Sequence, residues 1–177
     1  MGIVVVAGAA IDQWTKAWAE SHVRPLGITT LIPGLLDFRY VRNPGAFFSL
    51  GAGIEPSLRR VIFVVASLLV ITLIAVVHAR TPSTERRVRT ALSLLAAGAI
   101  GNLIDRIRTG EVVDFIHIEI GSVFRWATFN AADVFISVGI GLLVLDVLRG
   151  THHASPPNGA GSVPMAHARS TPDGKAK

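Results

Sequence analysis

Long apolar stretches alternate with short polar segments along this chain. Residues 61–77 contain no charged side chain, and residues 88–104 and 129–148 are also mostly apolar. A helix needs about 20 mostly apolar residues to cross the hydrocarbon core of a membrane. With their flanks, these stretches predict membrane-spanning helices over residues 59–79, 88–105 and 129–148.

A fourth span is predicted near the N-terminus, over residues 3–22. Residues 1–11 are apolar but too few to cross a bilayer, and an amphipathic pattern continues to His22. A cleaved signal peptide is the alternative, but the segment lacks the positively charged start that such peptides carry. Because the apolar pattern begins abruptly, the true N-terminus can also lie further upstream.

The segments between the spans carry signals for β-structure. Proline and glycine residues divide the region after the first span into short β-prone pieces, Ile28–Ile32 and Leu35–Val41. A hairpin is predicted between the third and fourth spans, from Val112–Ile118 and Val123–Thr128. Residues 150–177 are rich in proline, glycine and serine, which predicts a disordered tail.

The predicted fold is one membrane α-helical domain over residues 1–149, with four transmembrane helices and small extramembrane β-structure. Composition agrees with this class. Mean hydropathy is +0.52, half of the residues are hydrophobic and 16% are charged, whereas soluble domains carry about 25% charged residues.

The positive charge indicates membrane orientation, and no nucleic-acid partner is expected. The net charge is +5, but many arginines flank apolar runs. Connector 79–89 has the densest arginine cluster, so it and both termini are placed in the cytoplasm. Residues 23–60 and the later hairpin then lie outside. Trp14, Trp18 and Trp126 fall at the predicted outer interface, where tryptophan is enriched.

Several kinds of chemistry are excluded by what the sequence lacks. There is no cysteine, hence no disulfide, no thiol catalysis and no lipid anchor on a cysteine of this chain. No HExxH zinc motif, GxSxG nucleophile elbow or glycine-rich phosphate loop occurs, and the six histidines show no ligand spacing with carboxylates. No metal or cofactor is predicted.

Three aspartates stand out in this apolar context: Asp105, Asp114 and Asp133. A charged aspartate at the centre of a membrane helix costs about 2.5–3.5 kcal/mol on insertion scales. Two carboxyls that share a site titrate as a pair, so that one is ionised while the other keeps its proton. Such a pair can activate water and protonate a leaving amine. An ion-coupled transport subunit and a lipid-binding scaffold are the alternatives.

Small residues accompany two of these aspartates at four-residue spacing, on one helix face. They are Ser93, Ala97 and Gly101 before Asp105, and Ser137 and Gly141 after Asp133. Stripes of small residues let membrane helices approach closely. Helix packing with an aspartate as a cap is therefore the simpler interpretation of the spacing.

Five motifs occur in order along the chain. They are Asp12-Gln-Trp-Thr-Lys16, Asn43-Pro-Gly45-Ala-Phe47, Gly101-Asn102-Leu-Ile-Asp105-Arg106, Val112-Val-Asp114-Phe-Ile116 and Phe129-Asn130-Ala-Ala-Asp133. Together they resemble the lipoprotein signal peptidases (signal peptidase II), the membrane aspartyl peptidases of bacteria. The resemblance covers residues 10–148.

The resemblance implies that Asp114 and Asp133 form the catalytic dyad of an aspartic endopeptidase. The implied substrate is a lipoprotein precursor, cut just before a diacylglyceryl-modified cysteine. The outer segments would form an extracytoplasmic β-cradle, with a mobile amphipathic surface helix in residues 47–58. The protein would lie in the bacterial inner membrane, in contact with membrane lipid, with its active site at the outer leaflet. A monomer is expected.

The other candidate residues are expected to support the site or the substrate: Asp12, Lys16, Asn43, Gly45, Asn102, Asp105, Arg106 and Asn130. By resemblance, Asn102, Asp105 and Arg106 would orient the hairpin that carries Asp114. Simpler roles stand beside these. The first motif can form a local i,i+4 salt bridge, Asp105 and Arg106 can pair at a helix end, and asparagines can form turns or helix caps. Four further acidic residues are expected to be solvated or interfacial: Asp37, Glu111, Glu119 and Asp146.

Overall fold

The computed structural model describes residues 1–45, 54–120 and 124–150. The predicted tail lies outside these residues from position 151 onward. So does most of the surface helix predicted at residues 47–58, and the last part of that segment, from Pro56, belongs instead to a long helix.

Four long helices correspond to the four predicted spans: α1 (Gly2–His22), α2 (Pro56–Arg80), α3 (Arg86–Thr109) and α4 (Ala131–Gly150). The Glu55 carboxylate caps α2 by accepting the backbone N–H groups of Ser57 and Leu58. α3 continues past the predicted end at residue 105. It ends where Gly110 adopts a left-handed conformation with φ of 79°.

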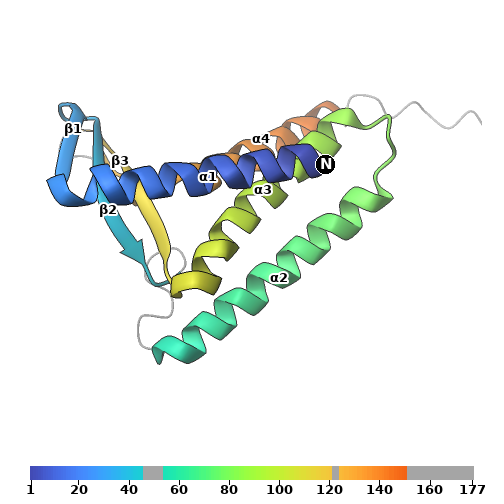
Figure 1. Cartoon of the computed structure of the whole chain (residues 1–177). Coiled ribbons are helices and arrows are strands. Elements are labelled where there is room, and N and C mark those ends of the chain that lie inside the picture. Colours follow the sequence, from blue (N-terminus) through green and yellow to red (C-terminus); the bar gives the residue numbers. More distant parts are fainter. Residues whose placement is uncertain (46–53, 121–123, 151–177) are drawn as a thin grey trace, which may run out of the picture.

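Three of these helices, α2, α3 and α4, are long and apolar enough to cross a membrane. The polar residues in the second half of α1, among them Asp12, Gln13 and Lys16, lower its hydropathy. α1 nevertheless packs against α3 and α4, and its C-terminal end packs on the sheet (Figure 1). The part of the chain that the structure describes thus contains four long helices, of which three have the composition of a span.

An antiparallel sheet lies at one end of the helices (Figure 1). Its strands are β1 (Ile28–Ile32), β2 (Leu36–Asn43), β3 (Val112–Ile120) and the two-residue β4 (Phe124–Arg125), in the order β1-β2-β3-β4. The later hairpin is shorter on its return strand than predicted. The chain after β4 instead forms an isolated bridge between Ile116 and Phe129, which leads directly into α4. Strand pairing of β2 with β3 sets Val41 opposite Asp114.

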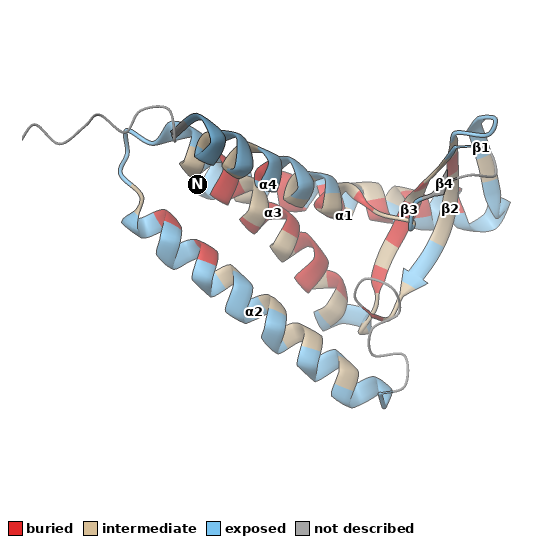
Figure 2. Cartoon of the chain, turned by 180° about the vertical axis from the view of Figure 1, so that it is seen from behind, coloured by how far each residue is buried: buried red, intermediate tan, exposed pale blue. Residues whose placement is uncertain are grey.

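α3 is the central helix. In the most apolar 18-residue stretch of α3, 56% of the residues are buried, whereas 11% are buried in the corresponding stretches of α2 and α4. Both α1 and α4 pack along α3, whereas α2 packs on α3 and stands apart from the other two (Figures 1 and 2). Between α2 and α4, beside the sheet, lies a cavity whose lining includes Phe63 of α2 and Val134 of α4.

The predicted stripe of small residues on α3 is confirmed as a contact face, because Ser93, Ala97 and Gly101 are all buried. A Cβ atom on Gly101 would lie 2.5 Å from Asp12 Oδ2. The prediction that Gly141 continues a contact stripe after Asp133 is wrong, because a Cβ atom at Gly141 would meet nothing within 4 Å. Gly139 makes the close approach instead, since its position on α4 faces α3.

Of the two alternatives expected for Asp37, a solvated or an interfacial charge, the solvated one is wrong. Only 6% of Asp37 is exposed, and its carboxylate accepts a hydrogen bond from Arg39 Nη2 at 2.6 Å. That hydrogen bond holds the pKa of the Asp37 carboxyl below its usual value. Glu119 lies 3.4 Å from the same guanidinium and is partly buried. Two strands, β2 and β3, therefore bring these charges together, with Asp37 buried and the other two partly exposed.

Candidate active site

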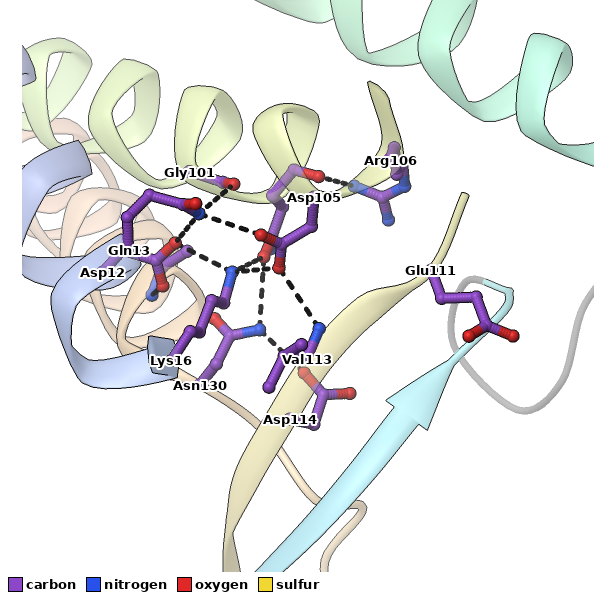
Figure 3. A network of polar contacts seen from close by, with 12 residues as sticks. Asp12, Gln13, Lys16, Gly101, Asp105, Arg106, Glu111, Val113, Asp114 and Asn130 are labelled. Atoms are coloured by element: carbon purple, nitrogen blue, oxygen red, sulfur yellow. Dashed lines mark hydrogen bonds and ion pairs between the residues drawn. The ribbon is translucent and has the colours of Figure 1, made fainter. Parts of the chain in front are cut away.

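A network of polar side chains lies where the helices meet the sheet (Figure 3). Lys16 on α1 is at its centre. Its ammonium nitrogen lies 2.8 Å from Asp12 Oδ2, 2.8 Å from Asp105 Oδ2 and 2.9 Å from Asn102 Oδ1. All four side chains are buried. A single buried cation therefore neutralises carboxylates from two helices, and the local Asp12–Lys16 salt bridge is one part of a larger cluster.

The first motif also fixes the start of α4. Asp12 Oδ1 accepts the backbone N–H of Ala132 at 2.9 Å. Gln13 Nε2 donates to Asp105 Oδ1 at 2.9 Å and to the Gly101 carbonyl at 3.1 Å. Gln13 was not among the predicted site residues, although it lies inside the first motif, next to Asp12. Through these bonds α1 ties α3 and α4 together.

Asp105 connects the network to the sheet. Its Oδ2 atom accepts the backbone N–H of Val113, the residue before Asp114, at 3.2 Å. This contact fits the predicted role of Asp105 in orienting the strand. Within the described residues no ion pair joins Asp105 to Arg106, so that simpler interpretation is wrong. The partner of Asp105 is Lys16, because both side chains point into the helix interface.

Arg106 instead faces the space beside the network. Its Nη1 atom donates to the Asn102 carbonyl at 3.3 Å, and its guanidinium carbon lies 5.7 Å from the centre of the Phe63 ring on α2. This cation–π contact links α3 to the diverging α2 helix. Phe63 was not a predicted site residue, and nothing in its apolar run distinguishes it.

Asp114 on β3 is buried, with 3% of the residue exposed. It accepts two hydrogen bonds, from Asn43 Nδ2 to Oδ2 at 3.0 Å and from Asn130 Nδ2 to Oδ1 at 2.7 Å. Burial raises the pKa of the Asp114 carboxyl to about 6, the two amides oppose that rise, and nearby Asp133 adds to it. Asp114 is therefore suited to keep a proton that an ordinary aspartate loses.

Asp133 is the third residue of α4 and is partly exposed. Asn102 Nδ2 donates to its Oδ1 atom at 2.9 Å. The backbone N–H of Asn130 donates to its Oδ2 atom at 3.2 Å, and the Asp133 N–H donates to Asn130 Oδ1 at 3.0 Å. This reciprocal pair is a capping box. The helix-cap interpretation of Asn130 is thus correct for its oxygen, while its amide nitrogen serves Asp114.

The remaining asparagine, Asn43, also combines two roles. Its amide nitrogen holds Asp114, and its Oδ1 atom accepts the backbone N–H of Gly45 at 3.1 Å. That second bond is an Asx turn, the turn role considered from sequence. Gly45 itself is buried at the edge of the site.

Asp114 and Asp133 line one cavity of about 910 Å³. Its polar end includes Asn43, Asn102 and Arg106. Its apolar walls come from α2 and α4 and include Phe63, Ala66, Val70, Val134, Ile136 and Val138. The cavity therefore presents two carboxyls beside a surface suited to hydrocarbon. Among the described residues, no cluster of histidine and acidic side chains has the arrangement of a metal site.

A family model and the sequences of similar proteins indicate the same family for this chain. Residues 4–149 match the model of the family described as Signal peptidase (SPase) II. The lipoprotein signal peptidase of Geobacter metallireducens is 36% identical over 156 residues, covering 88% of this chain and 94% of that protein. The protein of the same name from Bifidobacterium longum subsp. infantis is 35% identical over 153 residues, covering 83% and 77%.

Two solved structures of bacterial membrane enzymes are similar to this chain over most of its length. A bacterial membrane enzyme determined by the in meso method at 2.3 Å superposes with a TM-score of 0.74 at 30% identity, covering 86% of this chain and 90% of its own. A second such structure, at 1.9 Å, gives a TM-score of 0.71 at 30% identity, covering 83% and 91%.

The apolar helices are those of a helical membrane protein, and two of its carboxyls line one cavity. The chain belongs to the signal peptidase II family. It is therefore a peptidase, and the family together with its apolar helices supports a multi-pass protein of a bacterial membrane.

Proposed function

We propose that this protein is an aspartyl endopeptidase that removes signal peptides from diacylglyceryl-modified lipoprotein precursors, cutting just before the lipidated cysteine. Asp114 and Asp133 are the proposed catalytic dyad. The observation that carries the proposal is that both carboxyls line one cavity and are bridged by Asn130. Relatives at 35–36% identity are named lipoprotein signal peptidases.

The proposed reaction uses one proton shared by the dyad. Asp114 is its proposed carrier at the start, because burial raises the pKa of Asp114 to about 6, so that it keeps a proton to higher pH than an ordinary aspartate. The Asp133 carboxylate takes a proton from water, and the water oxygen attacks the scissile carbonyl carbon while Asp114 protonates the carbonyl oxygen. When the tetrahedral intermediate collapses, Asp133 gives its proton to the leaving amine and the C–N bond breaks. Asp114 regains its proton from the hydroxyl as the new carboxyl forms.

The surrounding residues are proposed to position the dyad. Lys16 holds Asp105 and Asn102, and these in turn hold the β3 backbone at Val113 and the Asp133 carboxylate. The site is therefore supported by neighbours whose own hydrogen bonds are largely fixed. Arg106 has a single described hydrogen bond, at Nη1, which leaves donors that can reach a substrate carbonyl in the cavity.

The membrane placement is part of the proposal. Four spans are proposed, with both termini and the tail from residue 150 in the cytoplasm and the sheet as an extracytoplasmic cradle. The active site then lies at the outer leaflet of the inner membrane. The arginines at the end of α2 and the start of α3, which lie at the end of the helices away from the sheet, support this orientation. A monomer in contact with membrane lipid and a surface helix over the site complete the proposal.

Ion-coupled transport is the rival function for carboxylates within apolar helices. A relay needs ionisable groups at successive depths. Asp105 and Asp114 instead lie together at the sheet end of the helices (Figure 3), and Asp133, in the first turn of α4, lines the same cavity as Asp114. Membership of a peptidase family further favours hydrolysis.

The test of the proposed function uses the purified full chain in detergent. It should cleave a diacylglyceryl-modified precursor peptide and leave the unmodified peptide uncut. Mass spectrometry of the products should place the cut directly before the lipidated cysteine. Cleavage of both peptides at equal rates, or at another bond, would overturn the substrate assignment.

A further inference from the structure

Ser137 lies on α4 one helical turn after Asp133 and lines the same cavity. Four residues at about 1.5 Å each place it about 6 Å further along the helix axis, away from the sheet. It is exposed, and its neighbours Val134 and Val138 are apolar lining residues. Ser137 therefore presents a hydroxyl to the apolar part of the cavity.

This hydroxyl has no hydrogen-bond partner among the described residues. A serine or threonine in an apolar helix normally donates to the carbonyl four residues earlier. Ser67, Thr72 and Ser93 each do so, at 2.7, 2.8 and 2.7 Å. Thr90 resembles Ser137 in making no such bond, but it is an exposed residue near the start of α3. Ser137 is thus an unsatisfied donor within the proposed span.

An unsatisfied donor next to hydrocarbon is unfavourable unless something in the cavity accepts from it. Ser67, on the opposite wall of the cavity, does not offer a free donor, because its hydroxyl already donates to the Phe63 carbonyl. The chemistry that complements Ser137 is a hydrogen-bond acceptor without a charge, carried on an apolar molecule. An ester carbonyl of an acylated glycerol meets both conditions.

We propose that the Ser137 hydroxyl donates a hydrogen bond to an ester carbonyl of the substrate's diacylglyceryl group. This inference rests on the proposed function. In the substrate, the scissile nitrogen is joined to the ester through the cysteine Cα and Cβ, the thioether sulfur and the glycerol carbons. That chain has a length comparable to one helical turn. With the scissile bond at Asp133, the ester group reaches Ser137 and the acyl chains continue along the apolar walls.

The experiment compares two synthetic precursors with the same peptide. One carries the natural diester lipid, and the other carries a diether lipid that has the alkyl chains but no carbonyl. kcat/KM is measured for both with the purified full chain in micelles. We expect the wild type to favour the diester about three- to tenfold, as one ordinary hydrogen bond provides. Ser137→Ala should bring the ratio close to one.

Ser67→Ala is the matched control, since it removes a hydroxyl from the same cavity whose proton is already used. It should keep the diester preference, whatever its turnover. Ser137→Cys retains the shape with a weak donor, so it should show a reduced preference and serves if Ser137→Ala does not fold. A wild-type ratio near one, or a preference unchanged in either Ser137 variant, would overturn the inference. Failure of the wild type to cut either lipid-modified precursor would instead overturn the proposed function.

Discussion

Asn130 Nδ2 donates to Asp114 Oδ1 across 2.7 Å, while the remaining polar groups of Asn130 cap the helix that carries the second carboxyl. One side chain thus fixes the relative position of two aspartates that come from a strand and a helix. The cap and the bridge use different atoms of the same amide, so they can be separated by substitution.

Asn130→Ser should separate these roles. Serine is as good an N-cap as asparagine but is too short to reach Asp114. We expect the free energy of unfolding of the variant to lie within about 1 kcal/mol of the wild-type value. Its kcat should fall more than tenfold, because the bridge to Asp114 is gone. Asn130→Ala should lose stability as well as activity. Full turnover in folded Asn130→Ser would show that the bridge does not matter for catalysis.

Lys16→Met tests the buried cation. The substitution leaves two buried carboxylates, Asp12 and Asp105, without their shared partner, and we expect a loss of about 3–5 kcal/mol in the free energy of unfolding. Adding Asp12→Asn should recover part of that loss, because the charges are coupled. The exposed pair Glu20–Arg24, also spaced i,i+4, is the control: Arg24→Gln should change stability by less than about 1 kcal/mol. Equal effects of both substitutions would contradict the central role of Lys16.

The pKa of Asp114 predicts how stability changes with pH. Its folded-state value is about 6, against about 3.9 in an unfolded chain. The folded state therefore binds this proton more tightly, and its contribution favours folding below about pH 4 and is lost as pH rises through about 6. In Asp114→Asn this loss is absent. The stability of the variant relative to wild type should rise by up to about 3 kcal/mol between pH 4 and pH 7.

The measurement is the apparent free energy of unfolding of both proteins in mixed micelles at matched pH. Groups that do not interact with Asp114 titrate alike in both proteins and cancel in the difference, whereas Asp133, which raises the pKa of Asp114, contributes to it together with Asp114. The hydrogen bonds lost in Asp114→Asn shift this difference by an amount that does not depend on pH. A difference that does not change with pH would show that the Asp114 pKa is ordinary.

Gly98→Ala tests the close contact of α3 with α4. A Cβ atom at Gly98 would overlap the Ala132 carbonyl oxygen and lie 2.7 Å from Ile136 Cγ1. The helices would have to separate next to Asp133, so we expect about 1–3 kcal/mol of destabilisation together with reduced turnover. Gly141→Ala is the matched control on α4, because nothing lies within 4 Å of that Cβ position. It should be neutral or stabilising, since alanine favours a helix by about 1 kcal/mol over glycine.

The local features of this fold could be predicted because they depend on nearby residues. The uncharged run at residues 61–77 and the turn residues before Ile28 and after Ile32 specify a helix and a strand at those positions. The stripe on α3 could be placed by its spacing, since four residues return to the same helix face. The stripe on α4 could not, because the face that meets α3 depends on how the helices cross.

The residues that make up the site could be predicted, but the hydrogen-bond and ion-pair partners of each could not. The five motifs contain Asp12, Lys16, Asp105, Asp114 and Asp133. Figure 3 shows the first four at one end of the helices, and Asp133 lines the same cavity as Asp114. Partner choice is a long-range property. Lys16 rather than Arg106 pairs with Asp105 because the α1–α3 interface is buried, while the next position on α3 faces the cavity. No local spacing distinguishes these two cations.

The dyad assignment is tested most directly by turnover of a diacylglyceryl-modified precursor by wild type, Asp114→Asn and Asp133→Asn, with folding checked by thermal unfolding. Asp146→Asn, near the other end of α4, is the control for removal of a carboxylate. We expect each dyad variant to fold and to lose activity on the order of 10³-fold, the scale of general acid–base catalysis, while Asp146→Asn stays near wild type. Near-wild-type turnover by either folded dyad variant would contradict the account.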